Sequence, residues 1–201
     1  LKTVRKSWQG PMTVKIRLGH DALDMRDKFI ERIRLFEETG VDAITLHPRF
    51  FEDKFRRRAK HELFAWVASL TKLPLIANGD ILGPRTVKES PDLFRPMSGI
   101  MVGRMAIARP WIFAAWERPV QVDYADVWRR MVTYICEDFP TAAALKRIKL
   151  FTKYYARNFL FGHHFETKVC SATSLDIAQE RAGVFFSDPL DIHDEPALMG
   201  I

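Results

Sequence analysis

Hydrophobic and polar positions in the first half of the chain switch repeatedly between a period of two and a helical period. Residues 13–18 alternate and stop at Gly19, which predicts a strand. Residues 24–39 then place apolar side chains on one helical face, and Gly40 stands where a C-cap glycine belongs. The same two patterns recur further along, predicting strands over 41–47, 73–78 and 98–103 and helical segments over 61–70 and 84–89.

Strands that alternate with helices predict βα units and a parallel sheet, because parallel strands need a crossover between them. Four such units make half of a (β/α)8 barrel, which takes about 200–250 residues for the whole barrel. An open, flavodoxin-like sheet is the alternative, and periodicity alone does not separate the two.

The pattern becomes helical after Pro119, with segments predicted over Tyr124–Phe139, Ala142–Leu160 and Ser174–Ala182. We therefore predict an α/β domain over residues 1–117, a small all-helical domain over 118–187, and an acidic C-terminal tail over 188–201. The tail is expected to be loose because it is polar and interrupted by proline.

Composition narrows the class of protein. The chain has 201 residues, of which 47% are hydrophobic and 28% charged, and this balance excludes a mostly disordered chain. A membrane helix or signal peptide is not expected, because no apolar run reaches about 18 residues. Two cysteines suit a reducing cytoplasm. The net charge of +6 permits a polyanionic partner without requiring one, and the initial Leu1 indicates a fragment.

Candidate chemistry lies at the carboxyl ends of the predicted strands, where ligands bind in parallel α/β folds. His47, the turn Asn78-Gly79-Asp80, and Gly103-Arg104 follow three of these strands, and Lys15 shares one face of the first strand with Arg17. An inward-facing Lys15 is expected to be buried against an anion or an electron-rich ligand, because an unpaired buried ammonium is costly. A wet edge strand is the alternative.

Two glycine turns, each followed by a helix N-terminus, favour an anion site, to which Arg104 adds a charged fork. Phosphate loops beneath a lysine and a histidine fit flavin mononucleotide (FMN) or a sugar phosphate, and the residues leave both open. A metal site is not expected, because His163, His164 and the cysteines lack a zinc-binding spacing.

Four stretches at these strand ends resemble the second half of a tRNA-dihydrouridine synthase, a family of flavin-dependent barrels. Any one of them is weak, but the four occur in the family's order with suitable spacing. The matching stretches are Thr13-Val14-Lys15-Ile16-Arg17-Leu18-Gly19, Ile44-Thr45-Leu46-His47-Pro48-Arg49, Ile76-Ala77-Asn78-Gly79-Asp80-Ile81 and Met101-Val102-Gly103-Arg104-Met105-Ala106-Ile107-Ala108-Arg109-Pro110-Trp111-Ile112-Phe113.

The resemblance implies the C-terminal half of a (β/α)8 TIM barrel with FMN as cofactor and NADPH as reductant. It implies that Lys15 and His47 contact the flavin ring and act in catalysis, and that Arg17 and Arg49 lie on the substrate side. The phosphate side of the flavin would be held by Asn78, Gly79, Asp80, Gly103 and Arg104. The family's proton-donating cysteine lies in the first barrel half and is not in this chain.

The helical remainder resembles the family's tRNA-binding domain in position and character. Residues 146–168 contain six basic residues against Glu166, which suits a tRNA backbone. An ordinary basic helix face is the alternative. The expected phosphate contacts are Lys146, Arg147, Lys149, Lys153 and Arg157.

These observations predict FMN-dependent reduction of uridine to 5,6-dihydrouridine in tRNA by a cytoplasmic oxidoreductase. The chain alone is expected to be inactive, and a missing N-terminal half-barrel is its expected partner. The alternatives are a barrel oxidoreductase acting on a small molecule and a non-catalytic tRNA-binding remnant. Half a barrel would leave inward residues without opposing strands, and we expect these among Val14, Ile16, Ile44, Ile76 and Met101 or their neighbours.

Overall fold

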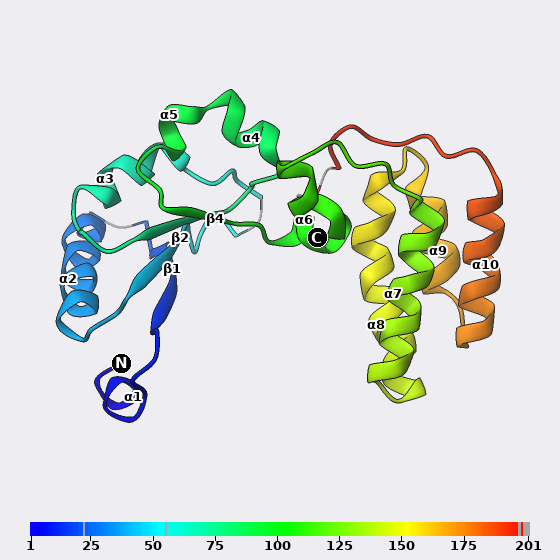
Figure 1. The fold of residues 1–201 in the computed structure, drawn as a ribbon, viewed down its shortest axis with the longest axis horizontal. Coiled ribbons are helices and arrows are strands. Elements are labelled where there is room, and N and C mark those ends of the chain that lie inside the picture. Colours follow the sequence, from blue (N-terminus) through cyan, green and yellow to red (C-terminus); the bar gives the residue numbers. More distant parts are fainter. Residues whose placement is uncertain (22, 55, 197, 199–201) are drawn as a thin grey trace. The chain divides into compact units, whose positions relative to one another are not determined.

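A computed structural model describes residues 1–21, 23–54, 56–196 and 198, and it divides the chain into two compact units (Figure 1). The first, here called the sheet unit, runs from Leu1 to Gly103. The second, the helical unit, begins at Arg104. Among the described residues, no helix is long and apolar enough to cross a membrane.

Four parallel strands form the sheet unit, in the order β1-β2-β3-β4. Strands that follow one another in this way are neighbours in a (β/α)8 barrel, whereas a doubly wound sheet reverses its order at a switch point. The structure therefore favours a partial barrel over the flavodoxin-like alternative. The strands span Thr13–Gly19 (β1), Ala43–Phe50 (β2), Leu75–Asn78 (β3) and Gly99–Met101 (β4).

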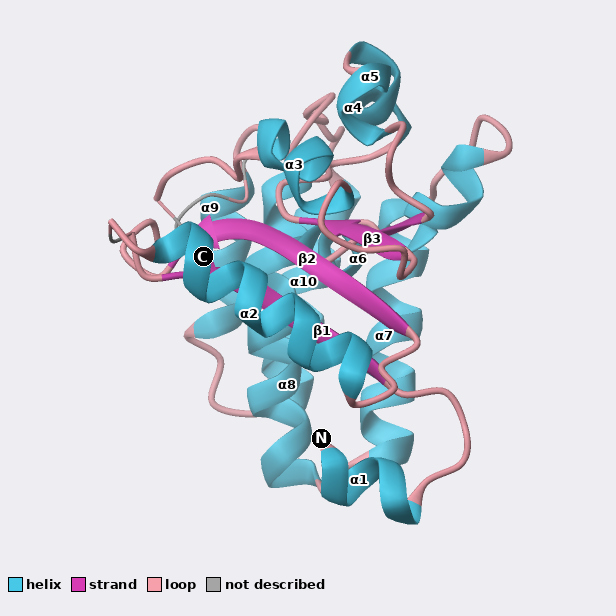
Figure 2. Cartoon of the chain, turned by 90° about the vertical axis from the view of Figure 1, so that its left-hand side faces the viewer, coloured by secondary structure: helices cyan, strands magenta, loops and turns pink. Residues whose placement is uncertain are grey.

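Helices cover one face of this sheet. Helix α2, Met25–Glu38, buries Phe29 and Ile33 and lies along β1 and β2 in Figure 2. Ile44 and Leu46 are completely buried, and they belong to the alternate positions of β2. The remaining helices of this unit are α1 (Lys2–Ser7), the 3-10 turn η1 (His61–Leu63), α3 (Phe64–Ala68), α4 (Pro84–Glu89) and α5 (Pro91–Phe94).

The opposite face of the sheet carries a different set of side chains from the one expected. Val14 pairs with Ile44 in the register, so both share the helix-covered face, and Ile16 pairs with Leu46 on that face. The inward assignment of Val14, Ile16 and Ile44 is therefore wrong by one residue of the strand period. Their neighbours Lys15 and Thr45 pair on the other face, in register with Ile76.

The helical unit consists of α-helices and short 3-10 turns and has its own core. Trp128, Ile148, Tyr155 and Phe165 are almost completely buried in it, together with smaller side chains from all four long helices. Trp128 Nε1 donates a hydrogen bond to Thr152 Oγ1 at 3.1 Å, which satisfies both groups inside the core. The elements are α6 (Arg104–Ala108), η2 (Pro110–Trp116), α7 (Tyr124–Asp138), α8 (Thr141–Tyr155), η3 (Ala156–Asn158), α9 (Gly162–Cys170) and α10 (Leu175–Ser187).

The boundary between the units lies at Gly103, earlier than the position after residue 117 that the sequence predicts. Helix α6 packs against α8 in the helical unit. The side chain of Asn158 fixes this packing, because its Nδ2 donates to the carbonyl of Ala108 at 2.7 Å. Periodicity alone does not show this contact, which joins residues far apart in the sequence.

The described part of the C-terminal segment is tied to the helical unit rather than loose; residues 197 and 199–201 of the predicted tail lie outside the described residues. Arg109 donates to the carbonyl oxygens of His193 and Asp194 at 2.5 and 2.9 Å, and its Nε donates to Asn158 Oδ1 at 2.8 Å. Leu160 N and Asp191 O form a further bond at 2.9 Å. One arginine thus satisfies backbone carbonyls that an extended, proline-containing segment leaves without partners of its own.

Two glycines of the helical unit have opposite surroundings. A Cβ on Gly162 would lie 1.8 Å from the carbonyl oxygen of Ala156, whereas a Cβ on Gly183 would meet nothing within 4 Å. We expect Gly162→Ala to destabilise the protein by about 3 kcal/mol through overpacking against backbone. Gly183→Ala, inside α10, should stabilise it by up to about 1 kcal/mol because alanine favours a helix. Urea denaturation followed by circular dichroism measures both changes, and a stable Gly162→Ala variant would contradict this packing.

Candidate functional site

The register of β1 on β2 brings the first candidate residues together. Lys15 pairs with Thr45 and Arg17 pairs with His47, so these side chains project to the same side of the sheet. Arg17 Nη2 donates to the carbonyl oxygen of Phe50 at 2.5 Å, which ties β1 to the end of β2. This side is the one that faces the interior when such a sheet closes into a barrel.

Lys15 is exposed, so the expectation that its ammonium is buried is wrong for this chain. The four strands present their inner face without strands opposite to them, and water therefore reaches a side chain that a closed barrel would enclose. The position of Lys15 on that face still agrees with the sequence pattern.

His47 lies at the centre of a cationic group. Burial, the largest cause, and the charges of Lys15, Arg49 and Arg17 together lower the pKa of its imidazole to about 4, against the opposing charge of Asp80. Its Nε2 is buried and has no hydrogen-bond partner among the described residues. The imidazole is therefore neutral at pH 7, and it offers a hydrogen bond to a ligand rather than an acidic proton.

The turn after β3 lies directly against His47. Gly79 has φ 103°, and a Cβ there would lie 2.5 Å from His47 Cδ2 and 3.0 Å from the Cβ of Ala59, so only glycine fits. His61 Nε2 donates to the carbonyl oxygen of Gly79 at 2.7 Å. Hydrophobic periodicity places His61 at the start of a helical segment and contains no signal for this contact.

The turn also reaches the fourth strand. Asn78 Nδ2 donates to the carbonyl oxygen of Met101 at 2.7 Å, and a Cβ on Gly103 would lie 4.0 Å from the same amide nitrogen. The two glycine turns expected to form a phosphate site are therefore adjacent at the carboxyl ends of β3 and β4.

Two candidate residues form an ion pair with each other. Arg49 Nη2 lies 2.5 Å from Asp80 Oδ2, and the side chain of Arg49 is completely buried. Asp80 Oδ2 also accepts a hydrogen bond from the backbone N–H of Ala59 at 2.8 Å. Arg49 and Asp80 are therefore paired with each other, beside the loop that follows β2.

Arg104 begins the helical unit, and its guanidinium contacts the C-terminal segment. Its Nη1 donates to the carbonyl oxygen of Leu198 at 2.5 Å. A phosphate group bound by Arg104 would therefore either bind the guanidinium together with the carbonyl oxygen of Leu198 or replace that oxygen as its hydrogen-bond acceptor.

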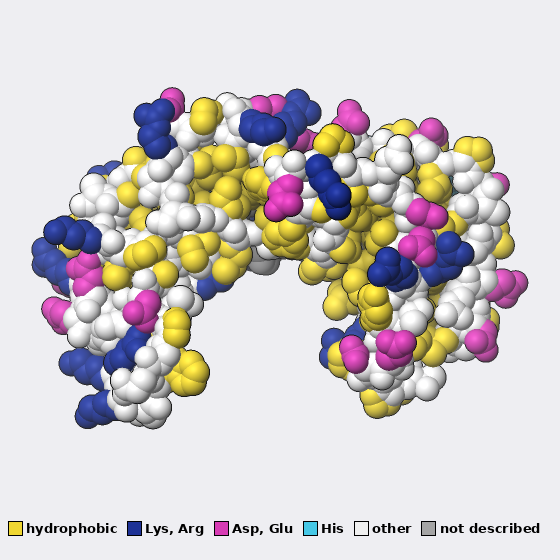
Figure 3. Space-filling view, viewed as in Figure 1, with side chains coloured by type: hydrophobic (Ala, Val, Ile, Leu, Met, Phe, Trp, Pro, Cys, Tyr) yellow, Lys and Arg dark blue, Asp and Glu magenta, His cyan; other side chains and the backbone are white. Residues whose placement is uncertain are grey.

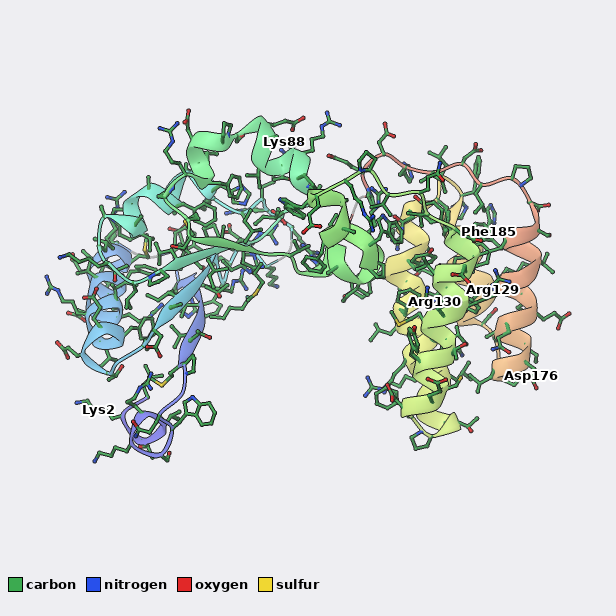
Figure 4. All side chains as sticks on the ribbon, in the orientation of Figure 1. Lys2, Lys88, Arg129, Arg130, Asp176 and Phe185 are labelled. Atoms are coloured by element: carbon green, nitrogen blue, oxygen red, sulfur yellow. The ribbon has the colours of Figure 1, made fainter. Side chains whose placement is uncertain are left out.

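The basic residues of α8 do not all share one surface. Lys146, Lys149 and Lys153 recur at helical spacing on one face. Arg147 instead lies 3.8 Å from the centre of the Phe139 ring, and Arg157 lies 3.0 Å from a carboxylate oxygen of Glu166. Helix α7 carries two further arginines, Arg129 and Arg130, which are labelled in Figure 4. On the face of the helical unit drawn in Figure 3, basic and acidic side chains are interspersed.

Within the ranges that the structure describes, no group of three or more His, Cys, Asp or Glu side chains is placed to hold a metal ion. Cys136 and Cys170 are both free thiols.

The two adjacent glycine turns, the neutral histidine and the cations lie at the strand ends of a parallel sheet, which is where α/β proteins bind their ligands. The family model described as Dihydrouridine synthase (Dus) matches residues 1–175, which include the sheet unit and most of the helical unit. The chain belongs to the tRNA-dihydrouridine synthase family.

In the alignments with curated relatives, about a third of the aligned positions are identical. The tRNA-dihydrouridine synthase B of Pasteurella multocida is 33% identical over 123 residues, or 61% of this chain and 36% of that protein. The synthase B of Pectobacterium carotovorum is 36% identical over 113 residues, or 56% of this chain and 34% of that protein. The "tRNA-dihydrouridine(47) synthase [NAD(P)(+)]-like" protein of Xenopus tropicalis is 36% identical over 105 residues, or 51% of this chain and 16% of that protein. The aligned part thus spans about a third of the two bacterial relatives.

The lowered pKa of His47 makes stability depend on pH. The unfolded chain binds a proton at this imidazole below about pH 6.5, whereas the folded protein binds it only near pH 4. Stability should therefore fall as the pH falls from 7 to 5, by about 2 kcal/mol more than in a His47→Gln variant. Urea denaturation of both proteins at the two pH values measures this difference, and equal losses would contradict the placement of His47.

Proposed function

We propose that this chain is the C-terminal half-barrel and helical domain of an FMN-dependent tRNA-dihydrouridine synthase. The complete enzyme reduces uridine to 5,6-dihydrouridine in tRNA, with NADPH as reductant, in the cytoplasm. The observation that carries this proposal is that Lys15, Arg17 and His47 share one side of the sheet of a family member, where His47 lies against the turn at Gly79.

Two features of the sheet unit support a bound flavin. The Nε2 atom of His47 is buried with no hydrogen-bond partner in the described part of the chain, so it has a hydrogen bond to offer a ligand. Gly79 keeps open the space beside that ring, which a Cβ would fill. FMN, when bound, supplies the hydride that reduces the uracil ring.

The chain's own residues bind and orient in this scheme. Lys15 and His47 contact the flavin ring, where an ammonium stabilises negative charge and a neutral imidazole donates a hydrogen bond. Asn78, Gly79 and Gly103 bring backbone N–H groups to the phosphate. Arg17 donates a hydrogen bond to the backbone of Phe50 at the end of β2, and it lies toward the substrate side.

The family's proton-donating cysteine and four further βα units lie outside this chain in the proposal. The exposure of Lys15 and the open inner face of the sheet favour a partner half-barrel that covers them. The edge strands β1 and β4 have ladder groups available for such a partner on one side.

The helical unit contacts the tRNA backbone through α8 in this proposal. The face that carries Lys146, Lys149 and Lys153 contributes most of the binding energy, because these ammonium groups are spaced along one surface. Arg147 and Arg157 contribute less, since one stacks on Phe139 and the other pairs with Glu166.

We expect the isolated chain to bind FMN more tightly than riboflavin and to reduce no uridine. The phosphate turns are present, whereas the proton donor is absent. Fluorescence quenching of the two flavins measures binding, and mass spectrometry of tRNA incubated with the chain, FMN and NADPH measures turnover. Dihydrouridine formed by the chain alone would contradict the half-barrel assignment.

Replacing Lys146, Lys149 and Lys153 together with alanine should weaken tRNA binding and make it less sensitive to salt. Each lost phosphate contact lowers the slope of log K against log salt concentration by about 0.9, so the slope should fall by about 2–3. Electrophoretic mobility shifts at several salt concentrations measure the slope.

The control is a variant with the same loss of charge in the sheet unit, Lys2, Lys6 and Lys88 to alanine; Lys2 and Lys88 are labelled in Figure 4. An equal effect of the two triple variants would show non-specific attraction rather than a site on α8. Tight tRNA binding without any flavin binding would favour the non-catalytic remnant instead.

A further inference from the structure

The ion pair between Arg49 and Asp80 is the most deeply buried charged contact that the structure describes. Arg49 is 0% exposed and the side chain of Asp80 is 20% exposed. Two further nitrogens of the guanidinium, Nε and Nη1, are buried and find no hydrogen-bond partner among the residues that the structure describes. A charge placed there costs free energy that surface pairs avoid, so its presence calls for a role beyond general stability.

Asp80 occupies a conformation that needs outside support. Its φ is 49° and that of the preceding Gly79 is 103°, so two consecutive residues lie in the left-handed region. A non-glycine residue there is strained, and it persists where its surroundings fix it. The carboxylate of Asp80 receives Arg49 from the end of β2 and the N–H of Ala59 from the following loop.

The turn is held at each of its other two residues as well. His61 bonds to the carbonyl of Gly79, and the side chain of Asn78 bonds to the backbone of Met101 in β4. The turn after β3 is thus bonded to residues of β2 and β4. Of these contacts, the one with Arg49 is made by a buried charge. Consecutive backbone N–H groups in such a turn form a concave anion site when their directions are fixed.

We propose that Arg49 is a positioning residue, which holds the turn Asn78-Gly79-Asp80 in the conformation that binds the phosphate of the flavin. The inference rests on the proposed function, because it takes that turn as the phosphate site. It also moves Arg49 away from substrate contact, since a completely buried guanidinium does not present itself to an RNA in solution.

The test compares two ligands that differ by the phosphate alone, FMN and riboflavin. In Arg49→Met the turn loses its anchor, and we expect FMN affinity to fall about tenfold while riboflavin affinity changes less than twofold. Arg49→Lys restores part of the FMN affinity, because an ammonium reaches Asp80 with a single bond. Arg95→Met is the matched control, which breaks the exposed pair of Arg95 with Asp92 and should change neither affinity.

Asp80→Asn and the double variant complete the cycle. If the two residues act as one unit, the double variant should bind FMN no more weakly than the weaker single variant. Circular dichroism verifies that each variant is folded, and Arg49→Lys and Asp80→Asn carry the test if Arg49→Met is not.

The outcomes separate the inference from the proposed function. Equal loss of FMN and riboflavin binding, or loss of neither, overturns the positioning role while leaving the flavin proposal in place. A wild-type chain that binds FMN and riboflavin equally well overturns the phosphate assignment, and the inference with it. Loss of FMN binding alone, with partial rescue by lysine, supports the positioning role.

Discussion

A buried charge at the carboxyl end of the sheet joins the loops from which the candidate site is built. Arg49, at the end of β2, is enclosed by protein and meets Asp80 immediately after β3. The turn that contains Asp80 also contacts His47, His61 and the backbone of β4. The geometry of three strand ends therefore depends on one ion pair. Removing either partner would leave the other charge uncompensated.

The electrostatics of the site follow from the strand register. Lys15, Arg17 and His47 share a face because parallel partners project to the same side, and Arg49 adds a further positive charge. The imidazole of His47 stays neutral because it is buried and because protonation would add a positive charge beside these cations. A surface of this kind favours an anionic ligand, such as a phosphorylated cofactor or a nucleic acid.

The basic residues of 146–168 differ in their surroundings, which their sequence alone does not show. Lysines on one face of α8 remain directed along a common surface, whereas two arginines of the same run are engaged by Phe139 and Glu166. Arg109 meanwhile serves the fold itself, by fastening the C-terminal segment through backbone carbonyls. The family match covers the whole sheet unit and most of the helical unit.

Local sequence determined the four strands, the glycine turns and the helices α2, α7, α8 and α10, because hydrophobic period and turn chemistry act over a few residues; it did not predict α9. Strand-end position also placed His47, Asn78, Gly79 and Gly103 on one edge of the sheet, and the period of two placed Lys15 on one face with Arg17. Tertiary structure alone decided the exposure of Lys15, the pairing of Arg49 with Asp80, the contact of His61 with Gly79, and the anchoring of residues 191–194. Each of these joins residues from different elements, and such contacts depend on how the elements pack, which neither periodicity nor composition records.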